Sequence, residues 1–320
     1  MRYDGIDLLR GIAVFGIIGC HLSLPDRTDA GWLVTALCNF NVGLFAALAG
    51  FLMGGVNDLG ALWGYAKKRM GRLMPSYVAW SVIFLLMTLV FDLLLDGGHV
   101  NPGYYTVQFW ISVGFQGGGA THLWFLVCLF YAQVLAAPAF GVFNKAKHGI
   151  LWLLVGGALV YASVNLGYWY GMYPVRLLAF LVTGHGLGLL ARNQLECLRR
   201  HLTLLFVVAV AVLAFHVCMI GTIPGFYRDW IAVGPVLIAF VVLDFKSERI
   251  QRIAAFLGAT SMGVYLVHPI FTRAISVVVA KCMPSPCSAL VVLSEWFLAW
   301  ILSLAVASIL LRIPFARRFV

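Results

Sequence analysis

Charged side chains are scarce in this chain, and their scarcity excludes the ordinary soluble classes of protein. Only 11% of the 320 residues are Asp, Glu, Lys or Arg, whereas 62% are hydrophobic. Soluble domains are about 25% charged and about 45–50% apolar. The mean hydropathy of +0.95 and the apolar runs that recur along the whole length predict an all-α membrane protein. We expect one integral membrane domain over residues 1–320 with no fused extracytoplasmic domain.

Several signatures of catalytic and metal sites are also missing. The sequence contains no nucleophile elbow around a serine, no phosphate-cradling glycine loop and no metal-binding run. The seven cysteines have no metal-ligand spacing, and most lie in apolar runs, where cysteine behaves as a small hydrophobe. Cys282 and Cys287 flank a short proline-containing segment of an expected exterior loop, where a disulfide and two free thiols are about equally compatible with the sequence. We therefore expect no bound metal.

The apolar runs predict about ten transmembrane helices, each long enough for a hydrocarbon core of about 30 Å. They cover residues 8–25, 32–56, 73–95, 120–141, 150–169, 174–191, 203–221, 230–244, 254–277 and 289–311. The first run resembles the core of a signal peptide, but it has no clear cleavage site and carries Asp4 and Asp7 in its flank, so we interpret it as a retained span. The eighth span is short and interrupted by Gly234-Pro235.

The distribution of basic residues predicts the orientation of these spans. With the N-terminus in the cytoplasm, 17 of the 22 Lys and Arg residues fall on the cytoplasmic side. Both termini and the 57–72 loop are then cytoplasmic, and the 96–119 loop is exterior. Part of the net charge of +10 is thus a topology signal, and binding of nucleic acid is not needed to explain it.

Arg10 and His21 are the most informative pair of residues, because both lie on the first apolar run with ten residues between them. Eleven residues advance an α-helix by three turns plus about 20°, and by about 16 Å. The two side chains therefore share one helix face, with Arg10 near the cytoplasmic end. Ionisable residues within a membrane span are costly and usually functional. A cation at one end and an imidazole at the other suit a long anionic donor whose reactive group lies deep.

A second basic cluster runs from Lys68 to Tyr77 at the entrance of the third span. Arg69 and Arg72 are three residues apart and are neighbours on a helix face. Arginine binds phosphate oxygens in bidentate geometry, so the cluster is a candidate phosphate clamp. The alternative is ordinary positive-inside charge, which taken alone explains the cluster better.

Histidines in two further spans are candidates for the reaction itself. His122 precedes Trp124 at the exterior start of the fourth span, and His268 lies in the ninth span before Pro269. At helical rise, His268 is about 21 Å and His21 about 20 Å from the inner ends of their spans, so the two could meet at one site. Taken singly, each is better explained as a structural residue. Glu295 in the tenth span either orients a histidine or belongs to the membrane interface.

In combination these segments resemble the acyltransferase 3 family of integral membrane acyltransferases. The segments that carry the resemblance are Ile6–Ala13 with the arginine–ten–histidine spacing, Val42–Leu52, Lys68–Tyr77, His122–Leu126 and Gly263–Pro269. Their order and spacing extend over nearly the whole chain. The resemblance implies a ten-helix bundle that moves an acyl group, often acetyl from acetyl-CoA, onto a hydroxyl of an envelope carbohydrate. It also points to a bacterial inner membrane.

The resemblance implies functional roles for Arg10, His21, Arg69 and Arg72, and less securely for His122. There are departures from the family pattern. Ala46 and Ala49 stand where the family usually has an aromatic residue and a serine. No Glu follows the His-x-Trp motif, in contrast to members fused to an esterase-like exterior domain. We expect a stand-alone enzyme whose acceptor the sequence does not specify.

The expected mechanism combines the residue pattern with the resemblance. Arg10, Lys68, Arg69, Arg72 and Tyr77 are predicted to bind acyl-CoA as co-substrate, without a metal. His21 is the predicted general base, because an imidazole with a reference pKa near about 6.5 suits proton transfer at neutral pH.

His122 is the second predicted catalytic residue, and His268, Trp124 and Glu295 are expected to orient the acceptor, a carbohydrate or glycolipid. Two other classes of function remain compatible with the residues. They are a transporter or flippase for a lipid-linked sugar or small solute, and a non-catalytic sensor or scaffold.

Overall fold

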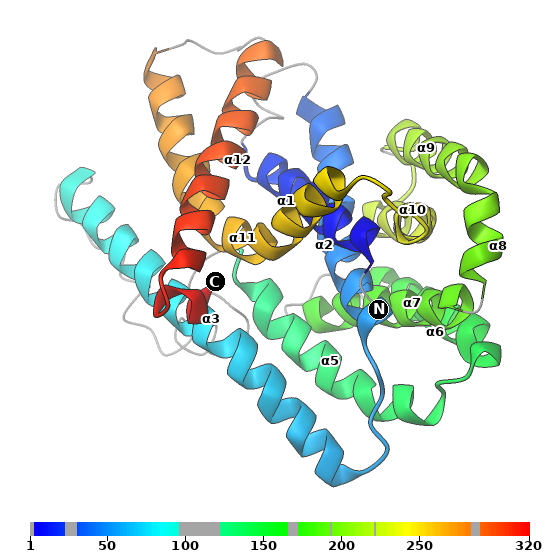
Figure 1. Cartoon of the computed structure of the whole chain (residues 1–320). Helices are drawn as coiled ribbons and strands as arrows, with labels where there is room; N and C mark the ends of the chain where they lie inside the picture. The colour runs from blue at the N-terminus through cyan, green and yellow to red at the C-terminus, as the bar shows by residue number, and fades with distance from the viewer. Residues whose placement is uncertain are drawn as a thin grey trace.

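The computed structural model of the protein describes residues 3–22, 31–95, 122–165, 172–192, 194–220, 222–282 and 289–320. In these segments the regular structure is helical (Figure 1). The helices are α1 (Asp4–Cys20), α2 (Gly31–Leu52), α3 (Leu59–Leu95), α5 (Trp124–Val142), α6 (Gly149–Asn165), α7 (Met172–Arg192), α8 (Leu195–Arg200), α9 (Leu202–Cys218), α10 (Gly225–Val241), α11 (Glu248–Cys282) and α12 (Ala289–Arg312). Short 3-10 turns, η2 (Ala146–His148) and η3 (Ala316–Phe319), precede α6 and follow α12.

Each predicted span overlaps one of the long helices, and the prediction of an all-helical membrane protein is confirmed. Within the described residues, six helical segments are long and apolar enough to cross a membrane: 59–87, 124–142, 146–165, 174–192, 248–279 and 289–312. Helices α1, α9 and α10 have 17 residues each, which is about 25 Å of rise. The count of ten spans and the cytoplasmic position of the termini therefore stay predictions.

Two boundaries differ from the sequence-based expectation. Residues 59–72 are not a loop but the first turns of α3, which begins after Asp58, whose carboxylate accepts a hydrogen bond from the backbone N–H of Ala61 at 2.7 Å. This N-cap and the helix-forming residues that follow explain the early start. The expected interruption at Gly234-Pro235 is also wrong, because α10 begins at Gly225 and continues through Pro235. The 96–119 loop and Cys287 lie outside the described residues.

The described helices expose apolar side chains and bury polar ones, as expected for a protein surrounded by lipid. Leu204, Val207 and Val210 on α9 are more than half exposed. Arg228 and Glu295 are buried to at least nine-tenths. Arg228 donates to the carbonyl oxygens of His216 and Ile223 at 3.0 and 3.1 Å, which satisfies its charge inside the bundle.

Glycines permit a close helix crossing between α2 and α7. A Cβ atom added to Gly50 would lie 1.8 Å from the carbonyl oxygen of Leu181, and one added to Gly184 would lie 1.9 Å from that of Ala47. Small residues that let two backbones approach are typical of membrane helix pairs. Gly50 and Gly184 therefore have no room for a larger side chain at this crossing.

Helix α3 lies at the edge of the bundle (Figure 1). It packs on α5 and on η3, whereas α1 packs on α2, α10, α11 and α12. Trp80 of α3 donates from its indole nitrogen to the carbonyl oxygen of Phe319 at 3.0 Å. This arrangement leaves room between α3 and the rest of the bundle for a cavity.

Candidate active site

Three histidines from separate parts of the chain meet in the structure. His21 is the C-cap of α1, His122 lies in the turn before α5, and His268 lies in α11. The ring centroids are 4.9 Å apart for His21 and His268, 5.4 Å for His122 and His268, and 6.4 Å for His21 and His122. We call these residues the histidine cluster. His21 is its exposed member, while His122 and His268 are 3% and 0% exposed.

Hydrogen bonds to the main chain hold the two buried rings of the cluster. The Nδ1 atom of His268 lies 2.6 Å from the carbonyl oxygen of Tyr265. To donate there, Nδ1 must carry the proton, so in the neutral ring Nε2 has the free lone pair. The Tyr265 hydroxyl donates to the carbonyl oxygen of His122, and the His122 side chain hydrogen-bonds the backbone of Leu266. The Nε2 atoms of His122 and His268 are buried and have no partner among the described residues.

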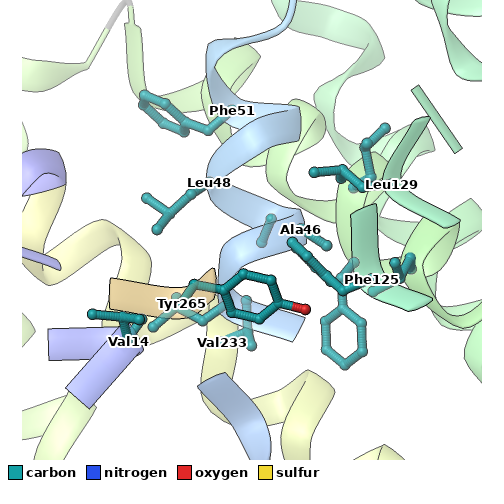
Figure 2. Close-up of a cluster of buried hydrophobic side chains, with 14 of the residues drawn as sticks. Val14, Ala46, Leu48, Phe51, Phe125, Leu129, Val233 and Tyr265 are labelled. Atoms are coloured by element: carbon teal, nitrogen blue, oxygen red, sulfur yellow. The ribbon is translucent and has the colours of Figure 1, made fainter. Parts of the chain in front are cut away.

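Figure 2 shows part of the hydrophobic core, in which Tyr265 of α11 packs among apolar side chains of α1, α2, α5 and α10. In this view Tyr265 lies across the core with its hydroxyl directed toward Phe125 of α5. Its ring centroid is 5.7 Å from those of both His122 and Phe125 and 6.0 Å from that of His268. Tyr265 is therefore shared by the apolar core and the histidine cluster.

A cavity of about 330 Å³ lies between α1, α2, α3, α5 and α11. Its charged residues are Arg10, Arg69 and Arg72, and its apolar walls come from α2, α3, α5 and α11. Tyr265 also lines it. We call this space the interhelical cavity. The three histidines do not line it, but Tyr265 contacts both the cavity and the histidine cluster, so the two features adjoin.

The three arginines of the interhelical cavity are held in different ways. Arg10 donates from Nη1 to the carboxylate of Asp7 at 3.2 Å. The guanidinium carbon of Arg69 lies 5.1 Å above the ring of Tyr65, an arrangement in which the ring attracts the cation. Arg72 is exposed and close enough to Arg10 for the two positive charges to repel each other. Such a group of cations is stabilised by a bound polyanion.

Four residues predicted from the sequence lie away from the interhelical cavity. Lys68 is exposed, Tyr77 is buried in the core, Trp124 is half-buried beside Phe125, and Glu295 is 3% exposed on α12. They are not among the residues that line the cavity. Lys68 lies one residue before Arg69, and the turn of about 100° per residue in a helix directs the two side chains differently.

Two residues at or beside the cavity, Asp7 and Gln133, were not predicted as site residues from the sequence. Asp7 orients Arg10, and it packs on α11, where a Cβ atom added to Gly258 would lie 2.7 Å from Asp7. Gln133 of α5 lines the cavity although it is only 3% exposed. The sequence does contain one indication of Gln133, because it follows His122 by eleven residues, the same spacing that separates Arg10 from His21.

The other buried histidines lie elsewhere in the bundle. His185 stacks on Phe140 with 3.7 Å between ring centroids, and His216 lies 3.7 Å from the carboxylate of Asp229. The described residues contain no group of three or more His, Cys, Asp or Glu side chains that could hold a metal ion. The imidazoles and arginines beside the interhelical cavity are able to transfer protons, to form hydrogen bonds and to bind phosphate.

Comparison with known proteins identifies the family. Residues 3–312 match the family model of an acyltransferase domain, the acyltransferase 3 family. No curated protein and no solved structure matched the chain. Since the match extends over nearly the whole chain, the protein belongs to this family and is a membrane acyltransferase, as the sequence motifs predicted.

Proposed function

We propose that this member of the acyltransferase 3 family moves an acyl group, acetyl in the simplest case, from acyl-CoA to a hydroxyl of a cell-envelope carbohydrate. The protein would be located in a bacterial inner membrane. The observation that carries the proposal is the interhelical cavity, which is lined by three arginines and by Tyr265, the neighbour of the histidine cluster. A cation group next to buried imidazoles suits a donor with an anionic end and a reactive end.

The phosphates of the donor would be bound by Arg10, Arg69 and Arg72. Coenzyme A carries a diphosphate and a ribose phosphate, so its negative charge offsets the repulsion among the three cations. The volume of about 330 Å³ is at the lower end of small-molecule sites, which are about 300–1,000 Å³. The cavity therefore suits the phosphates and the narrow pantetheine arm of coenzyme A, with apolar contacts from Leu48 and Leu129.

His21 would be the general base. It is the exposed ring of the histidine cluster, about 16 Å along α1 from Arg10. Its free nitrogen would take the proton of the acceptor hydroxyl as the oxygen attacks the thioester carbonyl carbon. The tetrahedral intermediate would then collapse by breaking the carbon–sulfur bond. The leaving thiolate would receive the proton from the imidazolium, which yields the ester and free coenzyme A.

The two buried rings would assist His21. The free lone pair on Nε2 of His268 faces the centre of the cluster in this scheme, accepts the second N–H of His21 and thereby fixes its tautomer. His122 would accept a hydrogen bond from an acceptor hydroxyl at its Nε2 atom, which has no partner among the described residues, and so orient the acceptor. Tyr265 holds the backbone of His122, so it would act as a positioning residue.

The acceptor would approach from the side opposite the arginines. Trp124 follows His122 by two residues and is half-buried, which offers a ring for stacking on a sugar. Glu295 is buried near the predicted outer end of α12 and would orient an acceptor hydroxyl.

A transfer assay with the purified protein in nanodiscs tests the proposal. The protein receives acetyl-CoA labelled in the acetyl group and a carbohydrate extract from the envelope. Release of free coenzyme A and appearance of O-acetyl groups on the carbohydrate are measured by thiol titration and mass spectrometry. We expect the two products in equal amounts. Movement of a lipid-linked sugar across proteoliposomes without acyl transfer would overturn the proposal in favour of a flippase.

A further inference from the structure

The side-chain carbonyl oxygen of a buried glutamine in the wall of the interhelical cavity has no hydrogen-bond partner among the described residues. Gln133 is 3% exposed, lines the cavity and has no described partner for its Oε1 atom. Buried polar groups in folded proteins are nearly always paired, and an unpaired one is destabilising. Another polar residue of the wall, Ser261, already donates from its hydroxyl to the carbonyl oxygen of Gly258 at 2.8 Å. Gln133 is thus available to a ligand in the cavity.

The position of Gln133 on α5 locates it along the cavity. Phe125, Leu129 and Gln133 follow one another at four-residue spacing and all line the cavity, so they form one face of the helix. Gln133 comes nine residues after Trp124, the first residue of α5, which is about 14 Å of rise. Because α5 begins beside His122, Gln133 lies on the arginine side of the cavity and not on the histidine side.

An apolar arm with an amide close to its phosphates fits this arrangement. The pantetheine arm of coenzyme A has two secondary amides in an otherwise apolar chain, and one of them is near the diphosphate. Each amide presents one N–H donor and one carbonyl acceptor, and the primary amide of Gln133 complements both, whichever way it is turned. A phospholipid also has a phosphate and apolar chains, but its ester linkages have no N–H to pair with Oε1.

We propose that Gln133 hydrogen-bonds the pantetheine amide nearest the phosphates and so selects phosphopantetheine thioesters over acyl donors that lack an amide. This inference rests on the proposed function, in which acyl-CoA is the donor. Gln133 acts in donor binding and has no part in proton transfer. Its loss therefore raises the KM for the donor and leaves kcat nearly unchanged.

The test compares three proteins and two donors. The proteins are the wild type, Gln133→Leu and Gln194→Leu, a matched control because Gln194 is exposed and outside the cavity. The donors are acetyl-CoA and an analogue in which an ester replaces the amide nearest the phosphates. Thermal unfolding in nanodiscs establishes that each variant is folded. KM and kcat are measured for every pair of protein and donor.

We expect the wild type and Gln194→Leu to prefer acetyl-CoA to the analogue by about tenfold in KM, the size of one hydrogen bond. Gln133→Leu should bind the two donors alike, with a KM for acetyl-CoA about tenfold higher than in the wild type and a similar kcat. The inference is overturned if Gln133→Leu keeps the wild-type preference, or if its kcat falls while KM stays. Absence of acetyl-CoA turnover in the wild type would instead overturn the proposed function.

Discussion

Replacing Arg72 by Ala tests the phosphate clamp most directly, because this arginine is the least engaged of the three. Arg10 is paired with Asp7, and Arg69 lies over the ring of Tyr65. Arg72 lines the interhelical cavity, is exposed, and makes no ion pair within the described chain. Its removal deletes one cation from the clamp and breaks no ion pair of the described chain.

The magnitude follows from what one charged contact contributes. A hydrogen bond to a charged group is worth about 1.5–3 kcal/mol, but an exposed charge is screened by solvent, so the lower end applies. About 1.5 kcal/mol corresponds to roughly a tenfold loss of donor affinity. Removing Arg72 also relieves its repulsion with Arg10, which stabilises the empty protein slightly.

The assay is titration of acetyl-CoA into the protein in nanodiscs, at low and at high salt. The control is Lys68→Ala, which removes a positive charge four residues earlier on the same helix but outside the cavity. We expect roughly a tenfold loss for Arg72→Ala and nearly wild-type affinity for the control. Because salt screens exposed charges over about 10 Å at 0.1 M, the difference should shrink at high salt. Equal losses for the two variants would show that general positive charge, and not the clamp, attracts the donor. Unchanged affinity in Arg72→Ala would refute the clamp itself.

Three further predictions concern the base, the packing and the orientation. His21→Gln should lower kcat by about 10²–10⁴ and leave donor affinity intact, because an amide cannot take the proton; turnover near the wild-type rate would make His21 a structural residue. Gly50→Ala should lower the free energy of unfolding by about 1–3 kcal/mol, since its Cβ would lie 1.8 Å from the backbone oxygen of Leu181. Gly54→Ala is the control, because a Cβ atom added there has nothing within 4 Å, and its stability should equal that of the wild type. Equal stability of the two variants would contradict the close crossing. A cysteine introduced near Arg317 should react only with reagents that reach the cytoplasm, and labelling from the exterior would refute the ten-span orientation.

The family, the membrane character and the individual helices followed from local sequence. Apolar runs separated by charged segments predict helices in a membrane whatever their neighbours are, because each helix satisfies its own backbone hydrogen bonds. The motifs around Arg10, His21 and His122 predicted the family, which the comparison confirmed over residues 3–312. The early start of α3 was missed because the apolar run that marks the third span begins only at residue 73, although Asp58 provides an N-cap.

The composition of the site required the tertiary structure. Helical spacing relates Arg10 to His21 because both belong to α1, and residue counts placed His21 and His268 at one depth. Spacing along the chain did not show that His122 joins them or how close the rings lie. Those three rings come together only because α1, the start of α5 and α11 pack side by side. The same packing places Arg72 at the interhelical cavity, whereas Lys68 lies about one turn earlier on α3 and does not line it. It also brings Gln133, which belongs to no motif, to the wall of that cavity. Which face of a helix meets a cavity depends on the rotation of that helix against its neighbours, and this is decided by side chains far apart in the sequence.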